Sequence, residues 1–291
     1  MAVEPKEHYS FPARVLYHLG RVWLSSLPGQ LLTLLMKALV AFFTIDNRRF
    51  RTELKQIILQ VYFTGIEAVP LIFLVAMLLG TLTITQALTY MPKVGFGDFF
   101  GNLMVIVIIR ELGPILTAFL IAGRTGSALS AFLGNMKVES EVDALETMGI
   151  DPIKYLVMPS VIGGMIAMLI INTFFSTVAI VVGFFAAKLL LATIMQNLVE
   201  SKLIWDNYFE SILMGLKPMD FVMVVIKPMI FGAIIAVNAC YFGLSTKNDV
   251  REVPKATSRS VVFSFIFVVV ADLILSLAYI LEYLRGFNKM I

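Results

Sequence analysis

Residues 101–122 read GNLMVIVIIRELGPILTAFLIA, a mostly apolar run with the charged pair Arg110 and Glu111 near its centre. About 20 mostly apolar residues are enough for a helix to cross the hydrocarbon core of a bilayer. Four further runs reach this length, and they cover Ile66–Tyr90, Pro159–Ala187, Met219–Gly243 and Ser260–Tyr283. The sequence therefore predicts an all-α integral membrane protein with about five transmembrane helices.

The composition of the whole chain supports this fold class. Apolar residues make up 59% of the 291 residues and charged residues 15%, and the mean hydropathy is +0.88. Soluble domains carry about 25% charged residues. Because no linker-like or low-complexity stretch interrupts the chain, residues 1–291 are predicted to form a single membrane domain.

An apolar segment before the first span has different properties. Leu27–Phe43 is shorter than a typical span, contains Lys37, and is followed by a basic group that ends at Lys55. This pattern predicts a helix lying in the membrane interface, within a cytoplasmic and interfacial N-terminal region of residues 1–55. A sixth, short span remains open as the alternative.

The distribution of basic residues predicts the orientation. With the N-terminus in the cytoplasm, the inside segments hold 15 of the 23 Lys and Arg residues, and the outside segments hold six. Loops rich in Lys and Arg stay on the cytoplasmic side. We therefore expect a multi-pass protein with a cytoplasmic N-terminus and a C-terminus on the outer side.

Charged residues inside the predicted spans are candidates for a functional site. Arg110, Glu111, Lys227 and Asp272 would each cost about 2.5–3.5 kcal/mol if they faced lipid. Neighbours on a helix point about 100° apart, so Arg110 and Glu111 need partners on other helices. We expect Lys227 to pair with Glu111, and Asp272 with Arg110. A cavity that meets a charged headgroup and ion pairs that only fix packing are both compatible with this pattern.

Pro114 follows the charged pair by three residues. A proline inside a helix removes one backbone donor, so it predicts a kink and leaves a carbonyl that needs another partner. The kink would open space beside Arg110 and Glu111. Small residues then recur every fourth position on one face, which predicts close helix packing, either within the chain or across a dimer. They are Ala118, Ala122, Gly126, Ser130 and Gly134.

Residues 137–152, KVESEVDALETMGIDP, break the apolar pattern between the second and third spans. Val138, Val142, Leu145 and Met148 recur at helical spacing, which predicts one apolar face of a short amphipathic helix. Ser140 with Asp143 resembles an N-cap pair. Gly149 stands where a helix C′ residue is expected, and Pro152 prevents continuation. We expect this helix on the cytoplasmic side.

The same segment is acidic, and its charge favours a protein partner. From Lys137 to Lys154 there are five acidic residues against two lysines. An acidic helix is poorly suited to a cytoplasmic surface of anionic lipid, so a groove on another protein is the better destination. A solvated acidic loop is the alternative.

Sequence motifs for chemistry are missing from the chain. It contains no GxxxxGK[ST] loop and no HExxH or CxxC motif, and both histidines precede residue 20. We therefore expect a protein that is not an enzyme, with no cofactor, no metal site and no nucleic-acid partner. A stand-alone secondary transporter or ion channel, using the buried charges as a relay, remains the alternative to a transporter subunit.

Several motifs together resemble the MlaE permease family of ABC transporters. The matching stretches are RELGPILT at 110–117, AGR at 122–124, EVDAL at 141–145, MGIDP at 148–152 and YLVMP at 155–159. A looser similarity extends through Lys227 and Cys240 to Asp272. The stretch at 253–257, VPKAT, departs from the family's usual Val-Gly pattern.

This resemblance implies the permease subunit of a transporter that moves phospholipid, or a related lipid, between a bacterial inner membrane and the outer envelope. It implies a homodimer bound to two ATPase subunits, with a ring of MCE-domain proteins outside and a small STAS-domain protein in some systems. By resemblance, a lipid cavity is lined by Arg110, Glu111, Pro114 and Lys227. The helix that couples to the ATPase then comprises Glu139, Glu141, Val142, Asp143, Leu145, Glu146, Met148 and Gly149.

Overall fold

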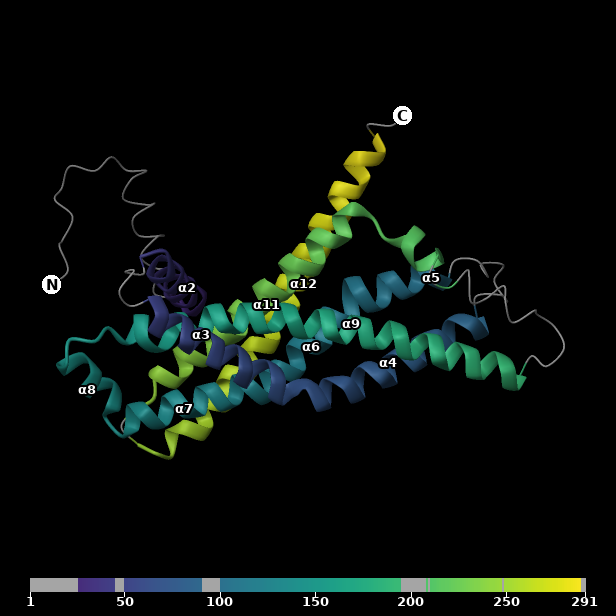
Figure 1. Cartoon of the computed structure of the whole chain (residues 1–291). Helices are drawn as coiled ribbons and strands as arrows, with labels where there is room; N and C mark the ends of the chain where they lie inside the picture. The colour runs from purple at the N-terminus through teal and green to yellow at the C-terminus, as the bar shows by residue number, and fades with distance from the viewer. Residues whose placement is uncertain are drawn as a thin grey trace.

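The computed structural model describes residues 26–44, 50–90, 100–194, 208, 210–247 and 249–288, and within these ranges every regular element is a helix (Figure 1). Part of the predicted N-terminal region, residues 1–25 and 45–49, lies outside the described residues. The first half of the chain contains α2 (Leu27–Phe43), α3 (Phe50–Gly65), the short 3₁₀ turn η1 (Ile66–Ala68), α4 (Val69–Tyr90), α5 (Phe100–Met104), η4 (Val105–Leu112), α6 (Gly113–Ile121), η5 (Ala122–Gly126) and α7 (Ser127–Val138). The second half contains α8 (Glu141–Thr147), η6 (Ile153–Val157), α9 (Met158–Ile194), α11 (Pro218–Leu244) and α12 (Glu252–Asn288).

Five helices are long and apolar enough to cross a membrane, which confirms the predicted fold class. They cover Arg51–Ala87, Asn102–Val138, Ile153–Leu189, Pro218–Leu244 and Glu252–Glu282. The first begins earlier than predicted, because α3 precedes Ile66 and runs on through η1 into α4. The basic residues Arg51 and Lys55 therefore belong to the start of a long helix and not to a separate loop.

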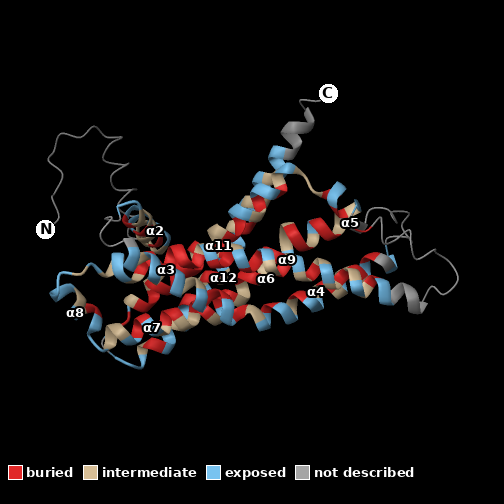
Figure 2. Cartoon of the chain, viewed as in Figure 1, coloured by how far each residue is buried: buried red, intermediate tan, exposed pale blue. Residues whose placement is uncertain are grey.

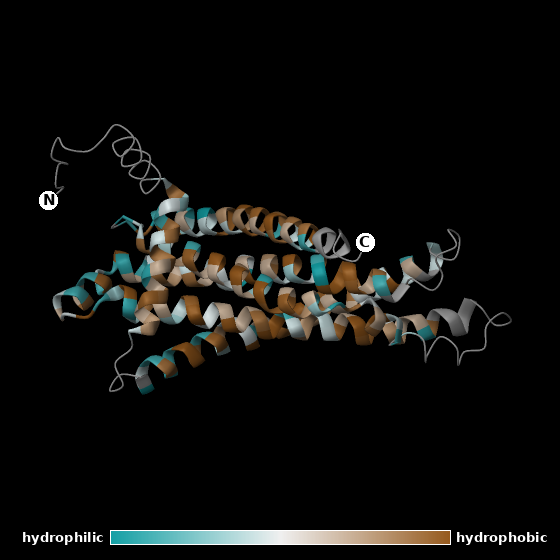
Figure 3. Cartoon of the chain, turned by 90° about the horizontal axis from the view of Figure 1, so that it is seen from above, coloured by the Kyte–Doolittle hydropathy of each residue, from teal (hydrophilic) through white to brown (hydrophobic). Residues whose placement is uncertain are grey.

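The N-terminal apolar helix α2 differs from the five long helices. It has 17 residues, and it is seen almost end-on in Figure 1, whereas the long helices run across the view. A helix that crosses the bundle direction and is too short to span is what an interfacial position requires. Hydrophilic residues colour the loop end of the bundle (Figure 3), which is the end where α8 lies in Figure 1.

Helix α9 occupies the centre of the bundle, and small residues let its neighbours approach its backbone. A methyl group added at Gly80 of α4 would come within 2.2 Å of the carbonyl oxygen of Ala179. At Gly232 of α11 it would come within 2.6 Å of the carbonyl oxygen of Gly164. Such contacts replace the hydrophobic driving force that is missing between helices in lipid.

The long helices differ in how much of their apolar surface is buried inside the bundle. In the most apolar 18-residue stretch of each helix, 56% of the residues of α11 are buried but only 17% of those of α12. Figure 2 shows the buried residues concentrated along α6, α7, α9 and α11. The large exposed side chains of α12, such as Leu273, Ile274 and Leu277, are therefore available to lipid or to another chain.

The stripe of small residues packs within the chain, which decides between the two alternatives left open by the sequence. All five members, from Ala118 to Gly134, are buried. A methyl group added at Gly126 would come within 3.0 Å of Ile235 on α11, and one at Gly134 within 3.2 Å of Val253 on α12. The stripe is thus the surface by which the second span contacts α11 and α12.

Candidate functional site

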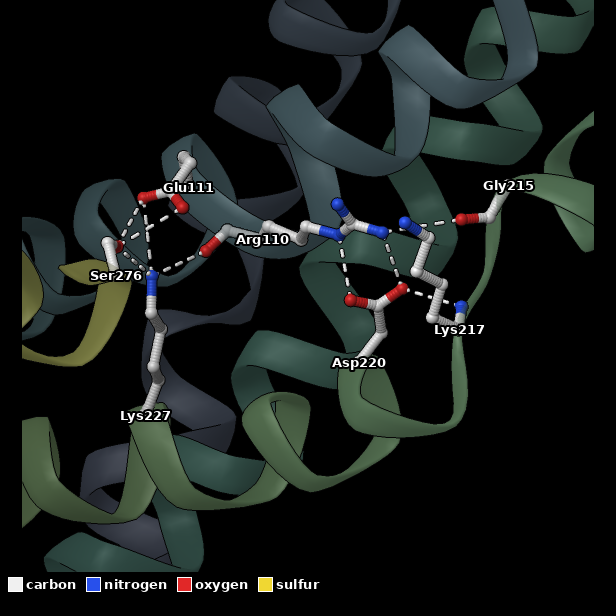
Figure 4. Close-up of polar contacts among 7 residues, drawn as sticks. All are labelled: Arg110, Glu111, Gly215, Lys217, Asp220, Lys227 and Ser276. Atoms are coloured by element: carbon white, nitrogen blue, oxygen red, sulfur yellow. Dashed lines mark hydrogen bonds and ion pairs between the residues drawn. The ribbon is translucent and has the colours of Figure 1, made fainter. Parts of the chain in front are cut away.

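Arg110 is held by an aspartate that the sequence analysis overlooked. Its Nε lies 2.7 Å from Asp220 Oδ1, and its Nη2 donates a hydrogen bond of 2.7 Å to Asp220 Oδ2 (Figure 4). Nη2 also reaches the carbonyl oxygen of Gly215 at 3.3 Å, and the guanidinium lies 5.0 Å from the ring centre of Tyr279. The predicted pairing of Arg110 with Asp272 is wrong.

Asp220 lies in the first turn of α11, where it binds both Arg110 of η4 and the backbone just before α11. Its Oδ2 also accepts a hydrogen bond of 2.7 Å from the backbone N–H of Lys217, the residue before the helix. An acidic residue in this position satisfies free N–H groups and interacts favourably with the helix dipole. Asp220 is fully buried, so Arg110 and Asp220 together tie η4 to the start of α11.

Lys227 lies between two carboxylates. Its Nζ is 3.2 Å from Glu111 Oε2, as predicted, and 2.9 Å from Asp272 Oδ1. It also donates to Ser276 Oγ at 2.9 Å, and Ser276 donates in turn to Glu111 (Figure 4). Asp272 fails to meet Arg110 because it faces the ammonium of Lys227 instead.

The carbonyl freed by Pro114 has a specific partner. In a regular α-helix the N–H of residue 114 would bond to the carbonyl of residue 110, and proline has no N–H. Lys227 Nζ donates to this Arg110 oxygen at 2.8 Å. The residues before Pro114 form the π-helical η4, and at its end the Gly113 N–H bonds to Ile108 O, five residues back. π-Helical turns of this kind are frequent at functional sites.

The exposure of the charged side chains divides them into two kinds. Asp220, Lys227 and Asp272 are enclosed, with side-chain exposures of 0%, 3% and 7%, and Arg110 reaches 13%. Glu111 is 40% exposed. We call these five residues the charge network. Glu111 is the member that opens most widely to the surroundings of the bundle.

At the far end of the second span, α8 only partly follows the predicted helix. Val138 ends α7, so it does not share a helix face with Val142 and Leu145. Ser140 does precede α8, but its backbone is left-handed, with a φ of 61°, and its side chain makes no capping bond. Asp143 instead pairs with Lys137 at 2.6 Å. Ser140 therefore stands at the predicted N-cap position but does not form the predicted capping pair with Asp143, and the amphipathic face is shorter than expected.

The predicted end of this helix is confirmed in detail. Gly149 has a φ of 74°, and its N–H bonds to the carbonyl of Glu146 at 2.9 Å. The N–H of Ile150 bonds to the carbonyl of Leu145, also at 2.9 Å. This pair of bonds is the Schellman motif, which requires a left-handed residue and favours glycine.

One side chain of α8 is buried against the rest of the chain, and several others in and next to α8 are exposed. Val142 is buried, whereas Met148 is 65% exposed. Glu139, Glu141 and Glu146 are exposed, and within the described residues they form no salt bridge. We call residues 137–152 the α8 segment. In this segment the three glutamates and the apolar side chain of Met148 are exposed to the surroundings of the described chain.

Together these features define a multi-pass helical membrane protein with charged groups enclosed within its spans. The sequence profile of the Permease MlaE family matches residues 57–278, so the chain belongs to this family, as its motifs indicated.

Individual relatives agree with this assignment. Protein TRIGALACTOSYLDIACYLGLYCEROL 1, chloroplastic, of Arabidopsis thaliana is 31% identical over 213 residues, 73% of this chain and 58% of that protein. A probable ABC transporter permease protein of Rickettsia prowazekii is 29% identical over 223 residues, 77% of this chain and 82% of that protein. A probable ABC transporter permease protein of Synechocystis is 29% identical over 255 residues, which are 84% of this chain and 92% of that protein.

Proposed function

We propose that this chain is the membrane-spanning subunit of an ABC transporter that moves phospholipid or a related lipid. ATP hydrolysis then takes place in a separate subunit. Membership of the Permease MlaE family supports the permease role, as do relatives named as probable ABC transporter permeases. The Arabidopsis relative bears the name of a galactolipid, which supports a lipid as the cargo.

The observation that carries the proposal is the α8 segment. Its helix has a defined end at Gly149 and projects from the bundle, yet Met148 and three glutamates have no cover within the described chain. An ordered helix with an uncovered apolar residue suits a groove on another protein. We assign that groove to the ATPase subunit, with Leu145 and Met148 as the apolar contacts and the glutamates as the charged rim.

The remaining parts of the proposal rest on the family resemblance. They are a homodimer of permeases with two ATPase subunits, an MCE-domain ring on the opposite side, and a STAS-domain protein in some systems. They also place the chain in a bacterial inner membrane, with the N-terminus and the α8 segment on the cytoplasmic side. Lipid passes beside the charge network and the π-helical turn before Pro114.

The test is to purify the chain with its ATPase subunit in wild-type form and as Met148→Asp. Because Met148 is largely exposed, a charge there leaves the bundle intact and places an unpaired carboxylate in the proposed contact. We expect ATPase co-purification to fall at least about tenfold. The matched control is Met214→Asp, since Met214 is 75% exposed, lies near the start of α11, and should leave ATPase binding unchanged.

Two results would contradict the proposal. If Met148→Asp retains the ATPase fully, the α8 segment is not the coupling element. If purified protein in liposomes moves a substrate without any ATPase, the stand-alone transporter or channel becomes the better explanation.

A further inference from the structure

The charge network is one positive charge short. Arg110 and Asp220 neutralise each other in a closed pair. Lys227, in contrast, faces both Glu111 and Asp272. Within the described part of the chain, no second cation forms an ion pair with either of these two carboxylates. With all five side chains ionised, the network carries one unbalanced negative charge.

The place of this charge makes it costly. Lys227 is the tenth residue of α11, so it lies about 14 Å along a helix that spans the membrane. Charged groups at such a depth face a cavity or a partner, and an unpaired one is expensive. Asp272 is enclosed, whereas Glu111 is 40% exposed. A positive charge that arrives from outside the chain can therefore reach Glu111 and not Asp272.

Neither cation of the network is free to bind a phosphate. The guanidinium of Arg110 is occupied by Asp220, the carbonyl of Gly215 and the ring of Tyr279. An ammonium has three N–H groups. That of Lys227 is surrounded by four acceptors, namely two carboxylates, one hydroxyl and one carbonyl. The charge that the site offers to a ligand is negative.

We infer that Glu111 binds the ammonium group of an amine-bearing lipid headgroup, of the ethanolamine class. This inference rests on the proposed function in lipid transport and adds a specificity-determining residue to it. A primary ammonium donates charge-assisted hydrogen bonds to the Glu111 carboxylate and supplies the missing positive charge. An anionic headgroup without an amine would meet Glu111 with a charge of the same sign.

The experiment uses the permease purified with its ATPase subunit and reconstituted into vesicles. The vesicles contain equal amounts of phosphatidylethanolamine and phosphatidylglycerol with identical acyl chains. After re-extraction, mass spectrometry gives the ratio of the two lipids that stay bound. A charge-assisted hydrogen bond corresponds to about a tenfold preference, which we expect for wild type. Glu111→Gln should return the ratio to that of the vesicles.

The control variant is Glu67→Gln, which neutralises a glutamate of similar exposure that pairs with Arg124, outside the network. It should keep the wild-type ratio. Equal binding of both lipids by wild type would overturn the inference and leave lipid transport in place, and this result does not depend on whether Glu111→Gln folds. A preference that survives in a folded Glu111→Gln protein would also overturn it.

Two further outcomes separate the explanations. If lipid retention depends on pH through Glu111 but not on the headgroup, a proton supplies the missing charge, and the inference fails. If the wild-type complex retains no lipid of either class, the proposed function itself fails. Phosphatidylcholine gives a finer test, because its quaternary ammonium carries the charge but cannot donate a hydrogen bond. Its preference over phosphatidylglycerol should be smaller than that of phosphatidylethanolamine.

Discussion

The charge network and the α8 segment are two charged regions of this apolar chain, and they differ in how far their charges are paired within the subunit. In the network, contacts as short as 2.7 Å join enclosed side chains from three helices. In the α8 segment, Asp143 pairs with Lys137, but the three glutamates form no salt bridge within the described residues. The network makes most of its interactions inside the subunit and leaves Glu111 partly open, whereas the three glutamates of the α8 segment make no ion pair within the described residues. Mutations in the network should therefore mainly affect folding, and mutations in the α8 segment should mainly affect assembly, with at most small effects on folding.

The largest effect is expected for Asp220→Ala. This change leaves the enclosed guanidinium of Arg110 without its carboxylate, which costs about 3–5 kcal/mol. Cys240, the single cysteine, is fully buried, so its reaction with a thiol-specific fluorophore during heating reports unfolding. The control Glu252→Ala removes an exposed pair with Lys255 and should cost about 1 kcal/mol or less. Equal effects of the two variants would show that the Arg110 pair is not structural.

A somewhat smaller loss, about 3 kcal/mol, is expected for Lys227→Met. Methionine fills a similar volume, but it leaves two carboxylates facing each other and the Arg110 carbonyl without a donor. The partial exposure of Glu111 moderates the cost, because that carboxylate is less enclosed than Asp272. The same Cys240 assay measures it. Adding Asp272→Asn to Lys227→Met should restore part of the loss, and no recovery would contradict the shared-ammonium geometry.

The sequence predicted the spans well because each needs only length and apolarity, which are properties of the local chain. It also predicted the contact between Lys227 and Glu111, since charges in spans must find partners. It could not predict that Arg110 meets Asp220 and not Asp272. That choice depends on how the helices are rotated, and one residue changes the direction of a side chain by about 100°. Asp220 was missed because a carboxylate near the start of a predicted span does not stand out as buried.

The α8 segment shows the same division between local and tertiary information. The end at Gly149 was predictable from the local sequence, because a glycine that a proline follows shortly afterwards is a helix stop signal. Gly149 indeed has a left-handed backbone. The break at Ser140 was not, since serine rarely adopts a left-handed backbone and nothing in its neighbours requires one. This break separates Val138 from the helix and shortens the predicted apolar face.

Gly149→Ala tests whether the α8 segment acts in assembly. A methyl group there has open space around it, so the cost is the left-handed backbone alone, about 1–2 kcal/mol. We expect this cost to appear as about a tenfold weaker association with the ATPase, with the Cys240 unfolding temperature unchanged. Gly123→Ala is the matched control, because Gly123 also has open space and no positive φ. A lower unfolding temperature for Gly149→Ala would mean that α8 supports the bundle.

The smallest effect is expected for Asp143→Asn, and it gives the closest contrast with Asp220. Both carboxylates lie about the same distance from their cations, 2.6 Å and 2.7 Å, so contact length cannot separate them. Asp143 is half exposed and Lys137 is 26% exposed, which leaves both groups hydrated and screened by salt. We expect a loss of about 0.2–1 kcal/mol that disappears in high salt, whereas the loss at Asp220 should persist there. The Cys240 assay at low and high salt measures both variants, and a salt-resistant loss at Asp143 would show that the α8 segment is as enclosed as the charge network.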